Sequence, residues 1–93
     1  MTRKIEIVDQ ITQFEEAVAA SKLLSAKPGN ETLLELYSLY KQATSGDAPE
    51  KGDYGMFDFV AKAKHDAWKK LNGTTKGTAM EKYIELVTKL QKQ

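Results

Sequence analysis

Two tyrosines and a lysine lie close together in the run Tyr37–Thr44 (YSLYKQAT) and could bind an anionic ligand. In a helix, Tyr37, Tyr40 and Lys41 stand at positions i, i+3 and i+4, so the spacing predicts that they share one patch. A tyrosine offers a flat face for stacking and a hydroxyl that donates to phosphate oxygens, and the lysine adds positive charge. These groups suit the head group of a nucleotide. In the alternative interpretation both rings pack in the core and Lys41 is solvated.

A second polar and aromatic segment, residues 58–71, carries Lys62, Lys64, Lys69 and Lys70. Lys64 and Trp68 stand at i and i+4 on one face of a helix, and lysine binds phosphate well as a compact charge. The alternative is a solvated charged face whose tryptophan packs in the core. For Trp68 we keep that alternative and predict a core position.

The residue types offer little for catalysis. The chain has no cysteine and one histidine, His65, and it lacks the nucleophile elbow, the phosphate loops and the zinc-protease motif. His65 and Asp66 are adjacent, so they point to different faces of a helix, and we expect His65 to be exposed or at a rim. The sequence predicts no enzyme, no catalytic residue, no metal site and no cofactor.

The composition fits one small globular domain of 93 residues with a formal net charge of +1. The charge is uneven, because residues 55–76 carry five basic and two acidic groups. One basic helix in a near-neutral chain suits a small anionic ligand better than a nucleic-acid backbone. No apolar run is long enough for a membrane span, and the first residues do not read as a signal peptide, so we expect the cytosol.

The apolar spacing predicts an all-α fold of four helices. The expected helices span residues 9–24, Asn30 to the residues before Gly46, residues 59–71, and a last segment that begins near Thr75; the expected N-caps are Asp9, Asn30, Asp58 and Thr75. Gly46 is expected to end the second helix in a left-handed conformation. The short alternation Ile5–Val8 is the one pattern that could instead form a strand.

Several of these runs resemble the acyl-CoA-binding protein (diazepam-binding inhibitor-like) family. The runs that carry the resemblance are Tyr37–Asp47 (YSLYKQATSGD), Gly55–Phe59, Lys62–Trp68, Leu71–Gly73, Ala79–Met80, Tyr83 and, upstream, Phe14, Lys22 and Lys27–Pro28. They occur in one order with consistent spacing and cover residues 9–92. The resemblance therefore implies a domain at residues 9–93, preceded by an N-terminal extension at residues 1–8.

The resemblance implies an antiparallel up-down-down-up four-helix bundle that binds one medium- to long-chain fatty acyl-CoA ester without covalent chemistry. It implies that Tyr37, Lys41 and Lys64 contact the 3′-phosphate and that Tyr40 lies beside the adenine. It also implies that Lys22 and Tyr83 contact the ligand from the first and last helices. The side chains implied to face the acyl chain are Val18, Leu33 and Leu34.

The sequence departs from the family pattern at three places. Val60 stands where the family commonly has a further ligand-contacting lysine, and His65 replaces a frequent tryptophan. The loop at residues 50–54 is one residue longer than usual and lacks the Arg-Pro pair. These departures bear on affinity and on acyl-chain preference rather than on the class of ligand.

The leading hypothesis is a monomeric cytoplasmic carrier and buffer of acyl-CoA that makes transient contact with enzymes using acyl-CoA and has no nucleic-acid partner. The alternative is a helical interaction module whose basic and aromatic face binds protein or nucleic acid, with strong salt dependence and no need for an apolar tail. An acyl-CoA hydrolase or transferase is a third hypothesis, and the missing nucleophile–base pair argues against it.

Overall fold

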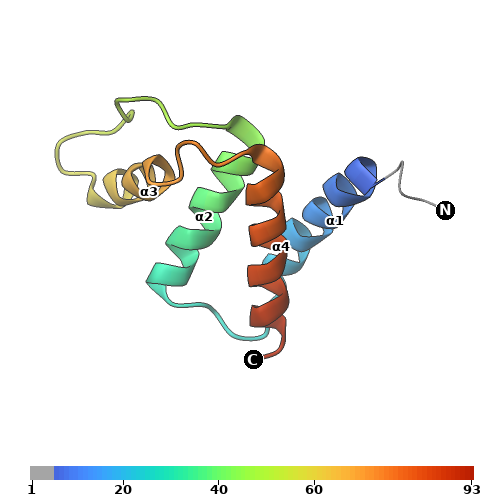
Figure 1. The fold of residues 1–93 in the computed structure, drawn as a ribbon. Coiled ribbons are helices and arrows are strands. Elements are labelled where there is room, and N and C mark those ends of the chain that lie inside the picture. The colour runs from blue at the N-terminus through green and yellow to red at the C-terminus, as the bar shows by residue number, and fades with distance from the viewer. Residues whose placement is uncertain (1–5) are drawn as a thin grey trace.

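The computed structural model describes residues 6–93, with side chains from Asp9 onward, and it contains four helices and no strand within that part of the chain. The helices are α1 (Glu6–Ser21), α2 (Asn30–Ser45), α3 (Phe59–Lys69) and α4 (Lys76–Gln91), as Figure 1 shows. The all-α prediction is confirmed. Residues 6–8 belong to α1, so the strand alternative at Ile5–Val8 is wrong for the described residues.

Two of the four expected N-caps are confirmed. The Asp58 carboxylate accepts a hydrogen bond from the backbone N–H of Ala61, and the Thr75 hydroxyl accepts one from Thr78. Each side chain satisfies a backbone donor that the first helical turn leaves free. Gly46 follows α2 with a φ of 84°, as expected for a glycine that ends a helix.

The other two N-cap predictions are wrong. α1 begins at Glu6, so Asp9 lies inside the helix, where its carboxylate accepts a hydrogen bond from Gln13 one turn later. At α2 the N-cap position belongs to Gly29, whose backbone is extended and which makes no side-chain cap bond. Asn30 is therefore the first helical residue rather than the cap.

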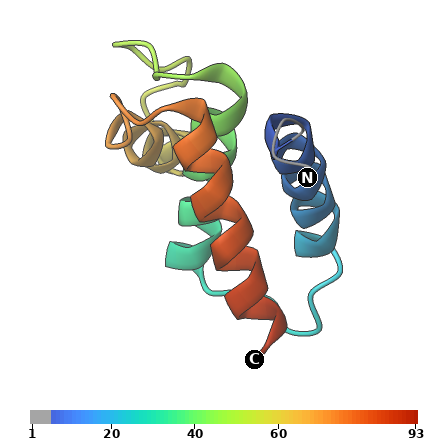
Figure 2. The same cartoon turned by 45° about the vertical axis from the view of Figure 1, so that its right-hand side comes forward.

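The helices pack in the spatial order α3, α2, α4, α1, because α2 contacts both α3 and α4, and α1 packs on α4 (Figure 2). The core lies between α1, α2 and α4. Its buried apolar side chains are Phe14, Ala17, Leu36, Leu39, Ala43, Ala79, Tyr83 and Val87. Among the described helices α3 packs on α2 alone, so the face that α2 turns to α3 is separate from this core.

The contacts also give the directions of the helices. Lys64 of α3 lies over Tyr37 of α2. One turn later on each helix, Lys41 of α2 lies over Trp68 of α3, so these two helices run in the same direction. The Gln42 amide, near the end of α2, donates to the Thr74 carbonyl just before α4, so α4 runs back along α2. α1 runs with α4 (Figure 1), which completes the up-down-down-up order.

The sequence predicts no membrane-spanning segment. None of the four is both long enough and apolar enough to span a lipid bilayer.

Candidate functional site

Four side chains meet where α2 and α3 face each other. The Lys64 ammonium lies 5.4 Å from the centre of the Tyr37 ring, and the Lys41 ammonium lies 4.8 Å from the centre of the Trp68 ring. The Trp68 indole N–H donates to the Gly46 carbonyl at 2.8 Å, which fixes that ring against the end of α2. We call Tyr37, Lys41, Lys64 and Trp68 the basic–aromatic cluster. It presents two ammonium groups and two aromatic faces from two helices.

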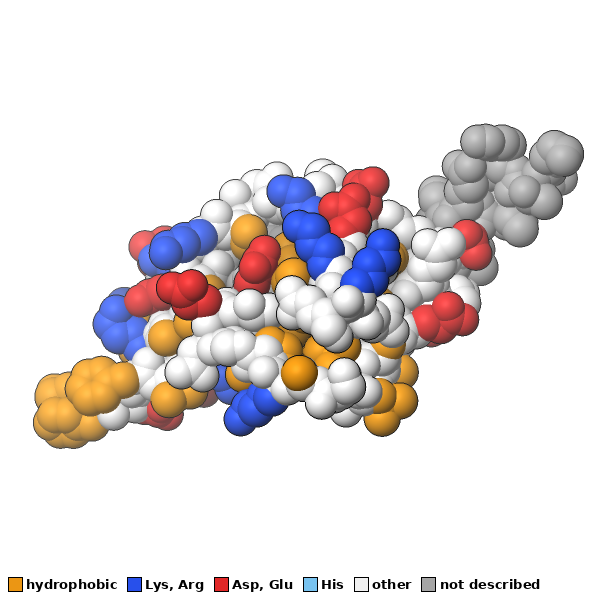
Figure 3. All heavy atoms as spheres, turned by 90° about the horizontal axis from the view of Figure 1, so that it is seen from below, with side chains coloured by type: hydrophobic (Ala, Val, Ile, Leu, Met, Phe, Trp, Pro, Cys, Tyr) orange, Lys and Arg blue, Asp and Glu red, His pale blue; other side chains and the backbone are white. Residues whose placement is uncertain are grey.

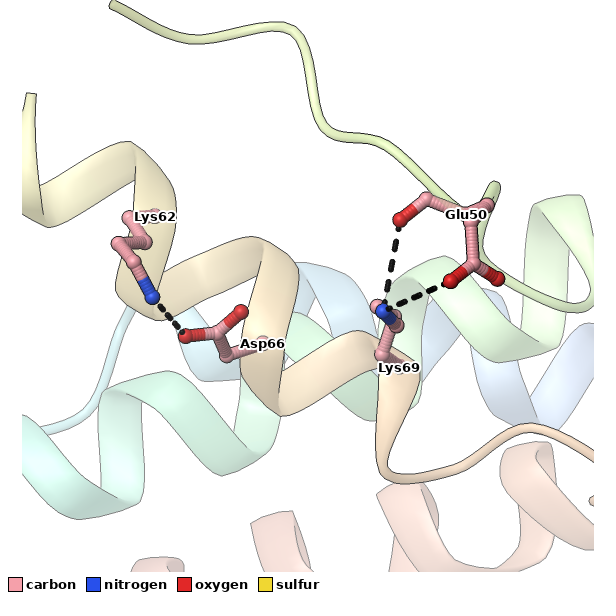
Figure 4. Close-up of polar contacts among 4 residues, drawn as sticks. All are labelled: Glu50, Lys62, Asp66 and Lys69. Atoms are coloured by element: carbon pink, nitrogen blue, oxygen red, sulfur yellow. Dashed lines mark hydrogen bonds and ion pairs between the residues drawn. The ribbon is translucent and has the colours of Figure 1, made fainter. Parts of the chain in front are cut away.

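Lys64 differs from the neighbouring lysines of α3, because those lysines contact acidic residues (Figure 4). Lys62 forms an ion pair with Asp66 at 2.9 Å, and this contact raises the pKa of the lysine and lowers that of the carboxyl. Lys69 reaches the Glu50 carboxylate at 3.8 Å and its carbonyl oxygen at 3.4 Å. Lys64 is therefore the lysine of α3 that the helix turns toward Tyr37.

An apolar groove of about 400 Å³ opens beside the cluster, between the first halves of α2 and α3. It is lined by Asn30, Leu33, Leu34, Phe59, Val60, Ala63 and Lys64. Lys64 belongs both to this groove and to the basic–aromatic cluster, so an apolar channel and a cationic group are continuous. Leu33 and Leu34, which the resemblance implied for the acyl chain, both line this groove together with Phe59, Val60 and Ala63.

A second cleft of about 480 Å³ lies on the other side of α2, and Tyr40 and Val18 line it with Phe14, Lys76 and Met80. The Tyr40 ring stacks on Phe14 with 6.1 Å between centroids, and 40% of its surface is exposed. Tyr40 thus faces α1, whereas Tyr37 and Lys41 contact residues of α3. Val18 likewise lies apart from Leu33 and Leu34.

Two further predicted site residues have different environments. Tyr83 is buried in the core, where its ring packs edge-on to Phe14 and its hydroxyl donates to the Ser21 hydroxyl at 3.2 Å. Lys22 is exposed in the turn that directly follows α1. The structure thus places Tyr83 behind the cleft that contains Tyr40, and Lys22 at the end of the helix that forms one wall of that cleft.

The predictions for His65 and Trp68 are wrong. His65 is 7% exposed, because the loop at residues 50–54 folds over it: Tyr54 and Trp68 pack against its ring, and Gly52 approaches so closely that no Cβ would fit. Its Nε2 is buried without a hydrogen-bond partner in the described structure. Trp68 is only partly buried and belongs to the cluster instead of the core.

This arrangement can hold an anion and an apolar chain at once. The cluster offers two cations and the Tyr37 hydroxyl for a phosphate group, and the groove offers aliphatic and aromatic walls for a chain. The described residues hold no group of three or more histidine, aspartate and glutamate side chains that could bind a metal ion. The sequence signal for Phe59 and Ala63 was their i, i+4 spacing on one face of a helix.

Comparison with known proteins gives the family. The family model described as "Acyl CoA binding protein" matches residues 12–87. The acyl-CoA-binding protein of Dictyostelium discoideum is 44% identical over 80 residues, which are 86% of this chain and 94% of that protein. The crystal structure of Oryza sativa acyl-CoA-binding protein 2 superimposes with a TM-score of 0.80 at 40% identity and covers 89% of this chain and 91% of that one.

The chain therefore belongs to the acyl-CoA-binding protein family, and this membership supports acyl-CoA binding in general terms. The same segment also occurs inside a longer protein. The enoyl-CoA delta isomerase 2 of Rattus norvegicus is 51% identical over 77 residues, which are 83% of this chain but only 19% of that protein. The chain thus spans about a fifth of the length of its enoyl-CoA delta isomerase 2 relatives in Rattus norvegicus and Homo sapiens.

Proposed function

We propose that the protein binds one medium- to long-chain fatty acyl-CoA ester and buffers and carries it in the cytosol as a monomer, without covalent chemistry. The single observation that carries this proposal is the continuity of the apolar groove with the basic–aromatic cluster through Lys64. An acyl-CoA has the matching chemistry, because a long apolar chain and a phosphorylated nucleotide are joined in one molecule. Transient contact with enzymes that use acyl-CoA belongs to the same proposal.

We assign the 3′-phosphate of the ligand to Tyr37, Lys41 and Lys64. The two ammonium groups come from different helices, so only the folded pair α2 and α3 presents them together. The Tyr37 hydroxyl is a hydrogen-bond donor one turn before Lys41. Charge-assisted hydrogen bonds to a phosphate are about twice as strong as neutral ones, which suits this group for recognising the head group.

We assign the adenine to the Tyr40 side of α2. The exposed ring of Tyr40 stacks on Phe14 and leaves an aromatic face at the cleft, and Val18 adds an apolar surface there. The position of Val18 favours a contact with the adenine over the acyl chain implied by the resemblance. Lys22 and Tyr83 stay proposed ligand contacts at the end and at the back of this cleft.

We assign the acyl chain to the groove lined by Leu33, Leu34, Phe59 and Val60. Burying about 14 methylene groups at roughly 0.8 kcal/mol each gives an upper bound near 11 kcal/mol. The loss of translational and rotational freedom costs roughly 4–15 kcal/mol, so the head group alone would bind weakly. The chain therefore supplies most of the affinity, and the head group supplies orientation and identity.

The absence of turnover is also part of the proposal. His65, the single histidine of the chain, is enclosed by Tyr54, Trp68 and Gly52, so it is not available as a general base at the groove. A thioester hydrolase or transferase needs a nucleophile activated by such a base.

Calorimetric titration with palmitoyl-CoA, free CoA and palmitate tests the proposal. We expect one palmitoyl-CoA per chain, and binding of CoA and of palmitate weaker by at least about tenfold, or about 1.4 kcal/mol each. Equal affinity for CoA with and without its acyl chain would overturn the assignment of the groove. Chromatography of the recovered ligand checks the chemistry, since release of free CoA at a catalytic rate contradicts a pure carrier.

A further inference from the structure

Four large apolar side chains project into solvent from the start of α3 and the turn before it. Met56 is 83% exposed, Phe57 79%, Phe59 69% and Val60 67%. We call these four residues the apolar tip. In Figure 1 the segment before α3 lies at the left end of the molecule, and Figure 3 shows hydrophobic side chains protruding at that end.

The backbone holds the apolar tip in a defined shape. The Asp58 N–H donates to the Gly55 carbonyl and the Phe59 N–H to the Phe57 carbonyl, so residues 55–59 form tight turns. The Asp58 carboxylate then caps α3, and the Phe57 and Phe59 rings meet edge-on at 6.5 Å between centroids. The tip is thus a fixed projection rather than a loose loop, and exposed apolar patches on soluble domains mark interaction sites.

We propose that the apolar tip inserts into the surface of an anionic lipid bilayer. The tip is a convex projection of four side chains, whereas a stable protein–protein interface needs about 800 Å² and roughly 20–30 residues from each partner. A bilayer needs no complementary shape, because aromatic and aliphatic side chains enter the boundary between head groups and acyl chains directly. A second copy of the chain would have to supply a matching pocket for the projection.

The charge around the apolar tip favours anionic lipids. Residues 55–76 carry five lysines and two aspartates. Both carboxylates are engaged, since Asp58 caps α3 and Asp66 pairs with Lys62. Lys64 is exposed and lines the groove beside Phe59 and Val60. Each lysine near an anionic surface adds roughly 1 kcal/mol of attraction, so Lys64 and the apolar tip act in the same direction.

The apolar tip and the groove share Phe59 and Val60. Insertion would therefore bring the mouth of the groove to the hydrocarbon boundary, where an amphiphilic acyl-CoA resides. This consequence rests on the proposed function, whereas bilayer binding by the ligand-free protein does not. An experiment on the ligand-free protein tests the docking surface alone.

The test is co-sedimentation of the ligand-free protein with vesicles of phosphatidylcholine and with vesicles that also contain phosphatidylserine. We expect binding to the anionic vesicles, and at least about tenfold weaker binding for the double variant Met56→Ser/Phe57→Ser. Neither residue lines the groove, so palmitoyl-CoA binding in solution should be unchanged. The matched control is Leu23→Ser, because Leu23 is 82% exposed after the end of α1 and should not affect vesicle binding.

Three outcomes would overturn the proposal: no binding of the wild-type protein to anionic vesicles, equal binding of the double variant, or an equal loss in Leu23→Ser. Analytical ultracentrifugation adds a fourth, since self-association that the double variant abolishes would identify a second copy as the partner. If the wild-type protein does not bind palmitoyl-CoA, the proposed function is contradicted instead. The result of the vesicle experiment would still stand, because it uses the ligand-free protein.

Discussion

Tyr37, Tyr40 and Lys41 show how far spacing alone positions side chains. Each residue of a helix turns the next by about 100°, so Tyr40 lies about 60° to one side of Tyr37 and Lys41 about 40° to the other. α3 approaches on the Lys41 side and α1 on the Tyr40 side, as the contacts of Lys41 with Trp68 and of Tyr40 with Phe14 show. Sequence spacing predicts a shared face, whereas the neighbouring helices decide which residues form one site.

Replacing Lys41 or Lys64 with methionine tests the 3′-phosphate assignment. Methionine keeps most of the apolar stem and removes the charge, so the fold should be retained. Each change should weaken palmitoyl-CoA binding by about 1–3 kcal/mol in calorimetry, the range of a hydrogen bond to a charged group.

Two controls accompany this prediction. The palmitoyl ester of dephospho-CoA lacks the phosphate in question, so wild type and both variants should bind it nearly alike. Lys70→Met removes an exposed charge from the residue after α3 and should leave binding unchanged. A variant that loses affinity equally for both ligands would show a general charge effect instead of recognition of this phosphate.

Val60→Lys should be tolerated and should tighten palmitoyl-CoA binding by about two- to tenfold. Val60 is 67% exposed on the groove wall, one turn before Lys64, so an ammonium there stays in water and adds charge near the head group. Val60→Met is the matched control, because it lengthens the side chain without adding a charge. A clear fall in the thermal midpoint of Val60→Lys, or weaker binding than for Val60→Met, contradicts this account.

The helices as elements were predictable from the sequence, and their ends were less so. The presence of four helices and the caps at Asp58 and Thr75 depend on local pattern, and they are as predicted. The burial of His65 depends on a loop that folds back over α3, and nothing in the local sequence determines that contact. The roles of Trp68 and Phe59 likewise depend on where α3 meets α2, which is a tertiary property.

The Asp47 carboxylate joins the end of α2 to the turn before α4. It accepts hydrogen bonds from the Gly73 N–H and from the Gln42 amide, and both lower the pKa of Asp47 below its ordinary value of 3.8. The ionised form is thus favoured in the folded state. Its contribution to stability is present above the unfolded-state pKa and is lost as pH falls through the lowered folded-state pKa.

We therefore expect Asp47→Asn to lower the thermal midpoint at neutral pH, with a difference from wild type that shrinks as pH falls below 3.8. Circular-dichroism melts over that range measure it. Asp53→Asn, which removes an exposed carboxylate from the loop before α3, should change the midpoint little. A difference that grows in acid, or an equal effect of Asp53→Asn, would argue against this role of Asp47.

Taken as a whole, the molecule has a core of three helices and a fourth helix that depends on one neighbour. α3 packs on α2 alone among the described helices, and the groove and the basic–aromatic cluster lie on that contact. Regions with few packing partners open at lower free energy than the core. We therefore predict that α3 separates from α2 more readily than the whole domain unfolds.

Native-state hydrogen exchange measures this opening. Without ligand, the amides of α3 should exchange at a lower opening free energy than those around Tyr83 and Val87 in the core of α4. With free palmitoyl-CoA at about a hundred times its Kd, protection of α3 should rise about a hundredfold, because opening α3 releases the ligand. The last turn of α4 frays without disturbing the groove, so its amides should not change. If α3 and the core of α4 open at the same free energy without ligand, the domain unfolds as one unit and this prediction is wrong.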